Sequence, residues 1–167
     1  MLKKHIYFIC AFFILTLAVI PVLTRAETLH NIDSQARNEL WLNTGFYSYH
    51  FQRDQGLDDH NWGVGLEYRY SSVNSVTAGR FHNSDLQMSD YVAWFWQPYA
   101  WGPLRLGGLL GAIDGYPKAT NGAWFPMLLP VASLEYQRVG INLTIIPSFQ
   151  DRLHGSISIQ FKFKLYE

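Results

Sequence analysis

A strict two-residue alternation of apolar and polar side chains in two segments restricts what this chain can fold into. In residues 61–71 every second side chain from Trp62 to Tyr70 is apolar, and those between them are glycine, glutamate, arginine or serine. Residues 156–165 repeat the pattern, with isoleucine, phenylalanine and leucine alternating with serine, glutamine and lysine. A helix would place those charges among the apolar residues. The pattern therefore predicts β-strands with one apolar and one mixed face.

Six further segments show the same alternation more weakly. They are residues 40–51, 75–82, 90–98, 103–113, 125–136 and 138–147. Together with the two clear segments they make eight strands, an even number and the smallest in transmembrane β-barrels. We therefore expect an all-β fold in which residues 40–167 form an eight-stranded antiparallel barrel with its apolar face toward lipid.

Composition supports a barrel that crosses a membrane. The chain holds 6 Trp, 10 Tyr and 11 Phe, yet no apolar stretch beyond the N-terminal region is long enough for a membrane helix. This combination is typical of a bacterial outer-membrane barrel, in which aromatic residues form girdles at both interfaces.

The N-terminus carries the features of an export signal. Lys3 and Lys4 precede an apolar run over residues 6–23, and small residues surround a cleavage point after Ala26. We interpret residues 1–26 as a cleaved signal peptide. An uncleaved membrane anchor is the alternative, because the run is nearly long enough to span a bilayer. Residues 27–39 are then a short periplasmic segment before the barrel.

Several classes of function are excluded by composition. The single cysteine, Cys10, lies in the signal region, so the exported chain has no disulfide and no cysteine nucleophile. That chain keeps ten basic against thirteen acidic residues, which gives no reason to expect a nucleic-acid partner. The histidines lack HxH or HExxH spacing and the acidic residues form no oxygen cage, so we expect no metal and no cofactor.

The joints between the expected strands alternate in length. Short joints lie near residues 72–74, 99–102 and 137–138, whereas longer ones cover residues 52–61, 83–89, 114–124 and 148–155. Bacterial barrels place short turns in the periplasm and longer loops outside the cell. The longer joints are therefore expected at the extracellular mouth.

This topology brings candidate catalytic residues to one rim. His50 ends the first outward strand, and Asn83 and Ser84 end the third strand of the barrel. An eight-stranded barrel is narrow enough for opposite walls to meet or to hold one small ligand. A histidine could then act as general base, and a serine as nucleophile or substrate-positioning group. The alternative is that these are solvated loop residues.

Several motifs indicate a family. They are YSYHF (47–51), NWGVGLEYRY (61–70), RFHNS (80–84), WFPMLLPVASLEY (124–136) and VGINLTIIPS (139–148). In order and spacing they resemble the lipid A palmitoyltransferases (PagP) of Gram-negative outer membranes, eight-stranded barrels that move a palmitoyl chain from a glycerophospholipid to lipid A. The resemblance covers most of residues 45–150.

The resemblance implies roles for three residues. The family's catalytic histidine falls on His50 and its essential serine on Ser84. The aspartate that precedes that serine in the family is replaced by Asn83, which can orient a partner but cannot stabilise an imidazolium by charge. Asp85 is the nearest carboxylate along the chain.

The resemblance also implies a site for the acyl chain. A small residue deep in the family's barrel sets the chain length, and bulky Phe95 falls near that position, with Ala93 on the same face. If Phe95 points inward, we expect a chain shorter than palmitoyl.

Three prolines carry a further expectation. Pro126, Pro130 and Pro147 predict breaks in strand pairing in the outer half of the barrel, because proline lacks the ladder donor. In the family such gaps let lipids enter sideways. Alternatively, Pro126 and Pro147 only mark strand ends.

Two hypotheses follow for the function. The first is an integral outer-membrane acyltransferase that moves an acyl chain from a membrane phospholipid to lipid A and acts as a monomer. The second is a non-catalytic small barrel that binds lipid or a surface partner, since fold does not imply function. An open pore is disfavoured because eight strands leave no channel.

Overall fold

The computed structural model describes residues 27–149 and 153–167. The expected signal peptide, residues 1–26, lies outside this part of the chain. Within it, no helix combines the length and the apolar character needed to cross a membrane.

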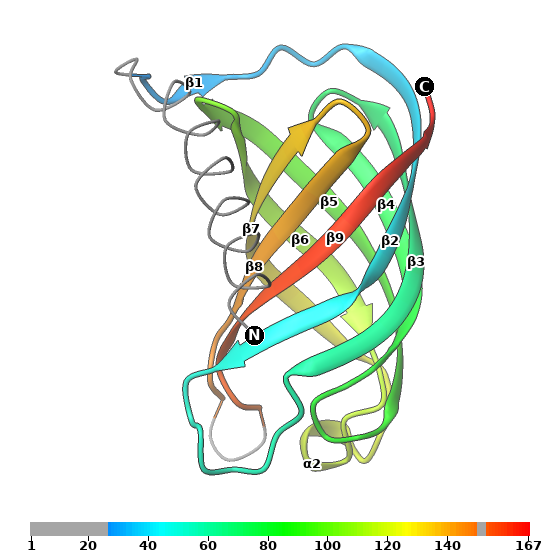
Figure 1. Ribbon diagram of the computed structural model, residues 1–167, viewed down its shortest axis with the longest axis vertical. Helices are drawn as coiled ribbons and strands as arrows, with labels where there is room; N and C mark the ends of the chain where they lie inside the picture. The colour runs from blue at the N-terminus through cyan, green and yellow to red at the C-terminus, as the bar shows by residue number, and fades with distance from the viewer. Residues whose placement is uncertain (1–26, 150–152) are drawn as a thin grey trace, which may run out of the picture.

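Eight long strands form one antiparallel sheet that closes on itself (Figure 1). Each strand pairs with its neighbours in the chain, and the last strand pairs with the first long one. The strands are β2 (Ala36–His50), β3 (His60–Ser71), β4 (Asn74–His82), β5 (Met88–Trp101), β6 (Leu104–Ile113), β7 (Phe125–Tyr136), β8 (Val139–Ile146) and β9 (Ser156–Tyr166). The predicted eight-stranded antiparallel barrel is confirmed.

The alternation places apolar side chains outside and polar ones in the lumen. On β3, Trp62 is 65% exposed whereas Glu67 is 1% exposed. On β9, Phe161 is 54% exposed and Lys162 1%. The exposed apolar side chains surround the barrel as a lipid-facing surface, as the two-residue period requires.

The N-terminal part of the barrel differs from the expected boundaries. β2 begins at Ala36 rather than at residue 40, and Ala36 pairs with Ser71 at the end of β3. A short strand, β1 (His30–Asn31), pairs with Tyr99 and Ala100 of β5. The described residues 27–39 therefore add backbone pairing to the end of the barrel that holds the short turns.

All four long joints lie at one end of the barrel, shown at the bottom of Figure 1, and the short turns lie at the other. The joint between β6 and β7 contains a single helical turn, α2 (Pro117–Thr120). Because longer loops face outward in bacterial barrels, this end is the extracellular mouth.

A buried ion network fills the periplasmic half of the lumen. Lys162 is completely buried, with its Nζ 3.1 Å from Glu67 Oε2 and 2.7 Å from Glu135 Oε1. Arg69 pairs with Glu135 and also with Glu39, 3.0 Å away. Each of these buried charges is thus paired with at least one opposite charge inside the barrel.

Pairing in the outer half of the barrel is interrupted on one side of β7. β6 pairs with β7 over its whole length, which covers Phe125 to Leu134 of β7. The pairing of β7 with β8 stops at Val131, opposite Thr144. The predicted break therefore lies in the β7–β8 seam, and the β6–β7 ladder is continuous.

Candidate active site

A pocket occupies the outer half of the lumen, on the extracellular side of the ion network. The space between its walls amounts to about 930 Å³, a figure that includes open solvent at the mouth. Polar groups gather near the extracellular mouth, and Phe95 and Leu109 form apolar surface deeper in the barrel. Side chains from both sides of the β7–β8 seam also line it, namely Met127, Leu129 and Ile146.

His50 faces this pocket and is held by a carboxylate. It is the last residue of β2, and the alternation of the strand turns it inward, where it is 4% exposed. Its Nδ1 lies 2.8 Å from Oδ1 of Asp59, the residue directly before β3. A ring nitrogen beside a carboxylate donates its proton, which leaves Nε2 free to accept one.

Asp59 is charged in this arrangement. The hydrogen bond from His50 lowers the pKa of the Asp59 carboxyl group, and the positive charge of Arg53 acts in the same direction. The Arg53 guanidinium lies 3.1 Å from the second carboxylate oxygen. Asp59 therefore supplies the negative charge beside the histidine that Asn83 lacks.

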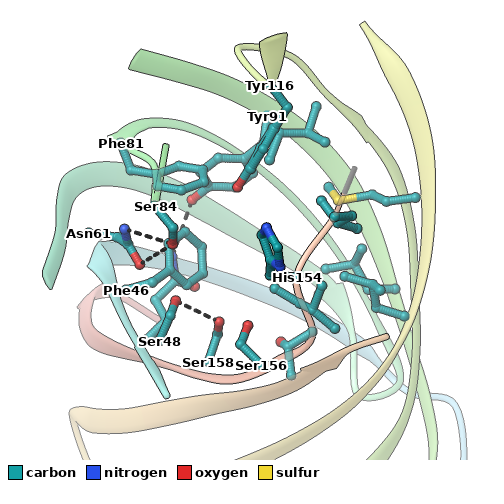
Figure 2. A pocket seen from close by; sticks show the side chains of 18 of the residues that line it. Phe46, Ser48, Asn61, Phe81, Ser84, Tyr91, Tyr116, His154, Ser156 and Ser158 are labelled. Atoms are coloured by element: carbon teal, nitrogen blue, oxygen red, sulfur yellow. Dashed lines mark hydrogen bonds between the residues drawn. The ribbon is translucent and has the colours of Figure 1, made fainter. Parts of the chain in front are cut away.

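Ser84 lines the same pocket from the loop after β4. Asn61 donates a hydrogen bond from Nδ2 to Ser84 Oγ over 3.3 Å, as drawn in Figure 2. Among the described residues, no direct hydrogen bond joins Ser84 to His50. The two side chains therefore share one pocket at the mouth but are held by different partners.

Asn83 is fully buried, and its side chain connects its own loop to β5 and to the joint after β6. Its amide nitrogen donates to Ser89 Oγ at 2.9 Å and to the Gly115 carbonyl at 2.7 Å. Its Oδ1 accepts the backbone N–H groups of Asp85 and Gln87. An aspartate could not donate to the Gly115 carbonyl. Among the described residues, no side-chain hydrogen bond joins Asn83 to His50 or Ser84, and these contacts fix the loop that carries Ser84.

Phe95 points into the barrel and is 4% exposed. It packs with Leu109, Val131 and Ala93 in one apolar cluster. Phe95 lines the pocket, whereas Ala93 packs within this cluster and is not part of the pocket wall. Phe95 therefore has the inward orientation for which the sequence predicts a shorter acyl chain, because the ring limits the depth of the pocket.

The three prolines lie along the interrupted seam. Pro126 and Pro130 are in the half of β7 that pairs with β6 alone, and Pro147 directly follows the last residue of β8. Both β7 prolines are exposed on the outer face of the barrel. Proline has no backbone N–H group to donate, which agrees with the absence of β8 pairing at Pro126 and Pro130.

Several residues of the site were not predicted from the sequence. Asp59 directly precedes β3, whereas Asn61 of β3 and His154 of the loop before β9 line the pocket. Figure 2 shows the His154 ring between an aromatic side of the pocket and a row of serines. The inward alternation of β2 and β9 was the signal for those serines, whereas the loop residues had no periodic pattern.

The chain was compared with known proteins. No family model matches it. It is 32% identical over 118 residues to a lipid A acyltransferase PagP from Laribacter hongkongensis, an alignment that covers 64% of this chain. The chain spans about half the length of that curated relative, 54%.

Solved structures with a similar fold are designed transmembrane β-barrels. One has a TM-score of 0.55 at 13% identity and covers 80% of this chain and 100% of its own. A second, determined by solution NMR, has a TM-score of 0.53 at 13% identity and covers 80% of this chain and 98% of its own. At this identity the likeness shows the fold alone.

These findings confirm the resemblance that the motifs indicated. The closed barrel and its lipid-facing surface agree with the fold expected from the sequence, and the curated relative is a lipid A acyltransferase. The chain is an integral outer-membrane β-barrel similar to the lipid A acyltransferases.

Proposed function

We propose that this barrel transfers an acyl chain from a membrane glycerophospholipid to lipid A at its extracellular mouth. The observation that carries the proposal is the His50–Asp59 pair, a buried histidine held by a charged carboxylate at the opening of an apolar pocket. The similarity to a lipid A acyltransferase supports the identity of the two lipids. We expect the protein to act as a monomer.

His50 is the general base in this proposal. Its Nε2 takes the proton from a lipid A hydroxyl group as that oxygen attacks the ester carbonyl carbon of the phospholipid. The carbon–oxygen bond to glycerol then breaks, and the proton passes from His50 to the departing glycerol oxygen. The products are acylated lipid A and a lysophospholipid. Asp59 stabilises the imidazolium that forms between the two steps.

Ser84 and Asn61 act beside the reacting ester. The Ser84 hydroxyl and the Asn61 amide are hydrogen-bonded to each other within the pocket wall. Because Ser84 has no direct bond to His50, we assign it to positioning the substrate rather than to attacking it. Asn83 maintains this position through the loop.

The apolar part of the pocket holds the acyl chain. Phe95 and Leu109 limit its depth, so the transferred chain is shorter than palmitoyl. The open β7–β8 seam beside Pro126, Pro130 and Pro147 gives the chain a lateral path from the membrane, since Met127 and Ile146 reach the pocket from its two sides.

A non-catalytic barrel that binds lipid is the second candidate. The hydrogen bond between His50 and Asp59 favours the enzyme, because a scaffold without chemistry does not need a buried histidine oriented by a carboxylate.

Lipid A mass spectrometry tests the proposal. A Gram-negative host that lacks its own palmitoyltransferase is made to express this chain, its His50→Ala variant, or neither. We expect one added acyl mass with the unaltered chain only, at a length below palmitoyl. Unchanged lipid A from cells with the folded barrel in the outer membrane would support the non-catalytic candidate.

A further inference from the structure

The pocket has two chemically different walls. Aromatic and aliphatic side chains cover one side, from Phe81, Tyr91, Phe95, Leu109, Ile113 and Met127. The other side, on β2, β8 and β9, is mostly polar: it carries the hydroxyl groups of Ser48, Thr144, Ser156 and Ser158, with Phe46 and Ile146 as its apolar members. We call these four hydroxyl residues the hydroxyl wall. Figure 2 shows part of this hydroxyl wall as Ser48, Ser156 and Ser158, opposite Phe81 and Tyr91. A plain hydrocarbon chain would need only the first kind of wall.

Strand register arranges the hydroxyl wall in two rows. Ser156 pairs with His50 in the row nearest the mouth. Ser158 pairs with both Ser48 and Thr144 in the next row. Two residues along a strand correspond to about 6.8 Å, so the second row lies only a few carbon–carbon bonds below the proposed catalytic histidine.

The residues of this wall are largely shielded from bulk solvent, and two of their hydroxyl groups, which line the pocket, have no partner among the described residues. Ser48 and Ser158 hydrogen-bond to each other at 2.9 Å. Within the described residues, neither Ser156 nor Thr144 has a side-chain hydrogen bond, although they are 2% and 9% exposed. A chain of methylene groups laid against this wall would leave these hydroxyls unsatisfied, which costs free energy.

We propose that the pocket is built for an acyl chain that carries a hydroxyl group close to its ester carbonyl. A 3-hydroxyacyl chain is the simplest member of this class. Its hydroxyl group bonds with Ser156 or Thr144, while the hydrocarbon beyond it lies against the apolar wall. This inference rests on the proposed function, because it takes the ester carbonyl to lie beside His50.

Binding of ether-linked analogues tests the inference without turnover. The full-length exported barrel in lipid nanodiscs is titrated calorimetrically with two glycerophospholipid ethers of equal chain length, one with a 3-hydroxyalkyl chain and one with a plain alkyl chain. We expect the hydroxylated analogue to bind about three- to tenfold more tightly, the size of one net hydrogen bond. Equal affinities, or tighter binding of the plain chain, would overturn the inference.

Two matched variants locate the effect. Thr144→Val and Ser156→Ala should each reduce the preference for the hydroxylated analogue. Thr77→Val is the control, because Thr77 also lines the pocket but its hydroxyl already donates to the Leu66 carbonyl. A preference that survives in both test variants, or that disappears in the control alone, would contradict the assigned wall.

A third ligand, a glucosamine lipid with the same 3-hydroxyalkyl ether, tests which headgroup accompanies the hydroxylated chain. Tighter binding of the glycerophospholipid form identifies the hydroxylated chain with the donor, and tighter binding of the glucosamine form identifies it with the acceptor or product. Both results support a hydroxylated chain in the pocket. Because the ethers cannot be transferred, equal binding combined with transfer of plain chains would reject the inference while leaving the proposed function intact.

Discussion

His50 Nδ1 and Asp59 Oδ1 lie 2.8 Å apart at the extracellular mouth, joining the end of β2 to the start of β3. The sequence motif offered Asn83 at the position where similar enzymes have an aspartate, which left the histidine without a nearby charge. The fold provides that charge from a different loop. The proposed chemistry therefore depends on Asp59, and the predictions begin there.

Replacing Asp59 should slow acyl transfer without weakening the binding of substrate. Asp59→Asn removes the charge that stabilises the imidazolium and weakens control of the ring orientation. We expect the rate constant of acyl transfer to fall roughly 10²- to 10⁴-fold with little change in KM. Steady-state assays of the purified barrel measure this change. Asp58→Asn is the matched control, because Asp58 bonds to the His60 backbone N–H and lies near His82 instead. Equal loss in both variants would contradict the assignment.

The same pair predicts a pH dependence of stability. The folded pKa of Asp59 is below its unfolded value of 3.8, mainly because of the hydrogen bond from His50. Its contribution is therefore complete above that unfolded value and is lost as pH falls through the lower folded pKa. The difference in urea midpoint between the unaltered barrel and Asp59→Asn should shrink as the pH falls below about 4. A difference that grows over that acid range would have the wrong sign.

Periodicity made most of the fold predictable. The alternation around Trp62 and Phe161 assigned faces correctly because a closed barrel has lipid on one side and a packed lumen on the other. The start of β2 at Ala36 was missed because residues 36–39 are mostly polar and are recruited by pairing with β3 rather than by an apolar face.

The site was only partly predictable for a related reason. His50 and Ser84 could be placed at one rim by counting strands and joints. Asp59 and His154 could not, because loop conformation rather than period decides where they point. Asn83 shows the same limit: its side-chain hydrogen bonds go to its own loop, to Ser89 of β5 and to the Gly115 carbonyl, and not to the pocket.

Shortening Phe95 should lengthen the transferred chain. Phe95→Ala removes the ring beside Leu109 and opens space toward the ion network, at a stability cost of about 3–5 kcal/mol. Competition between phospholipids of different acyl length, followed by mass spectrometry of the product, measures the preferred length. Trp94→Ala is the control, because that neighbouring side chain is 36% exposed on the outer face. An unchanged preference in Phe95→Ala would place the end of the acyl chain elsewhere.

Breaking the periplasmic ion network should destabilise the barrel. Lys162→Met removes the cation between Glu67 and Glu135 and leaves their buried carboxylates with less positive charge. We expect the free energy of unfolding to fall by about 3–5 kcal/mol, measured with urea in lipid vesicles. Lys164→Met, whose side chain is partly exposed, should cost much less. Similar losses in the two variants would contradict the importance of the central lysine.

Transfer of a labelled acyl chain tests the central claim most directly. The purified barrel is reconstituted in vesicles that contain lipid A and a phospholipid labelled in its acyl chain, and label in lipid A is counted over time. The account predicts transfer by the unaltered protein and loss of about 10²-fold or more of the rate in a folded His50→Ala variant. Equal transfer by both proteins, or none by the unaltered barrel when both lipids are present, would contradict it.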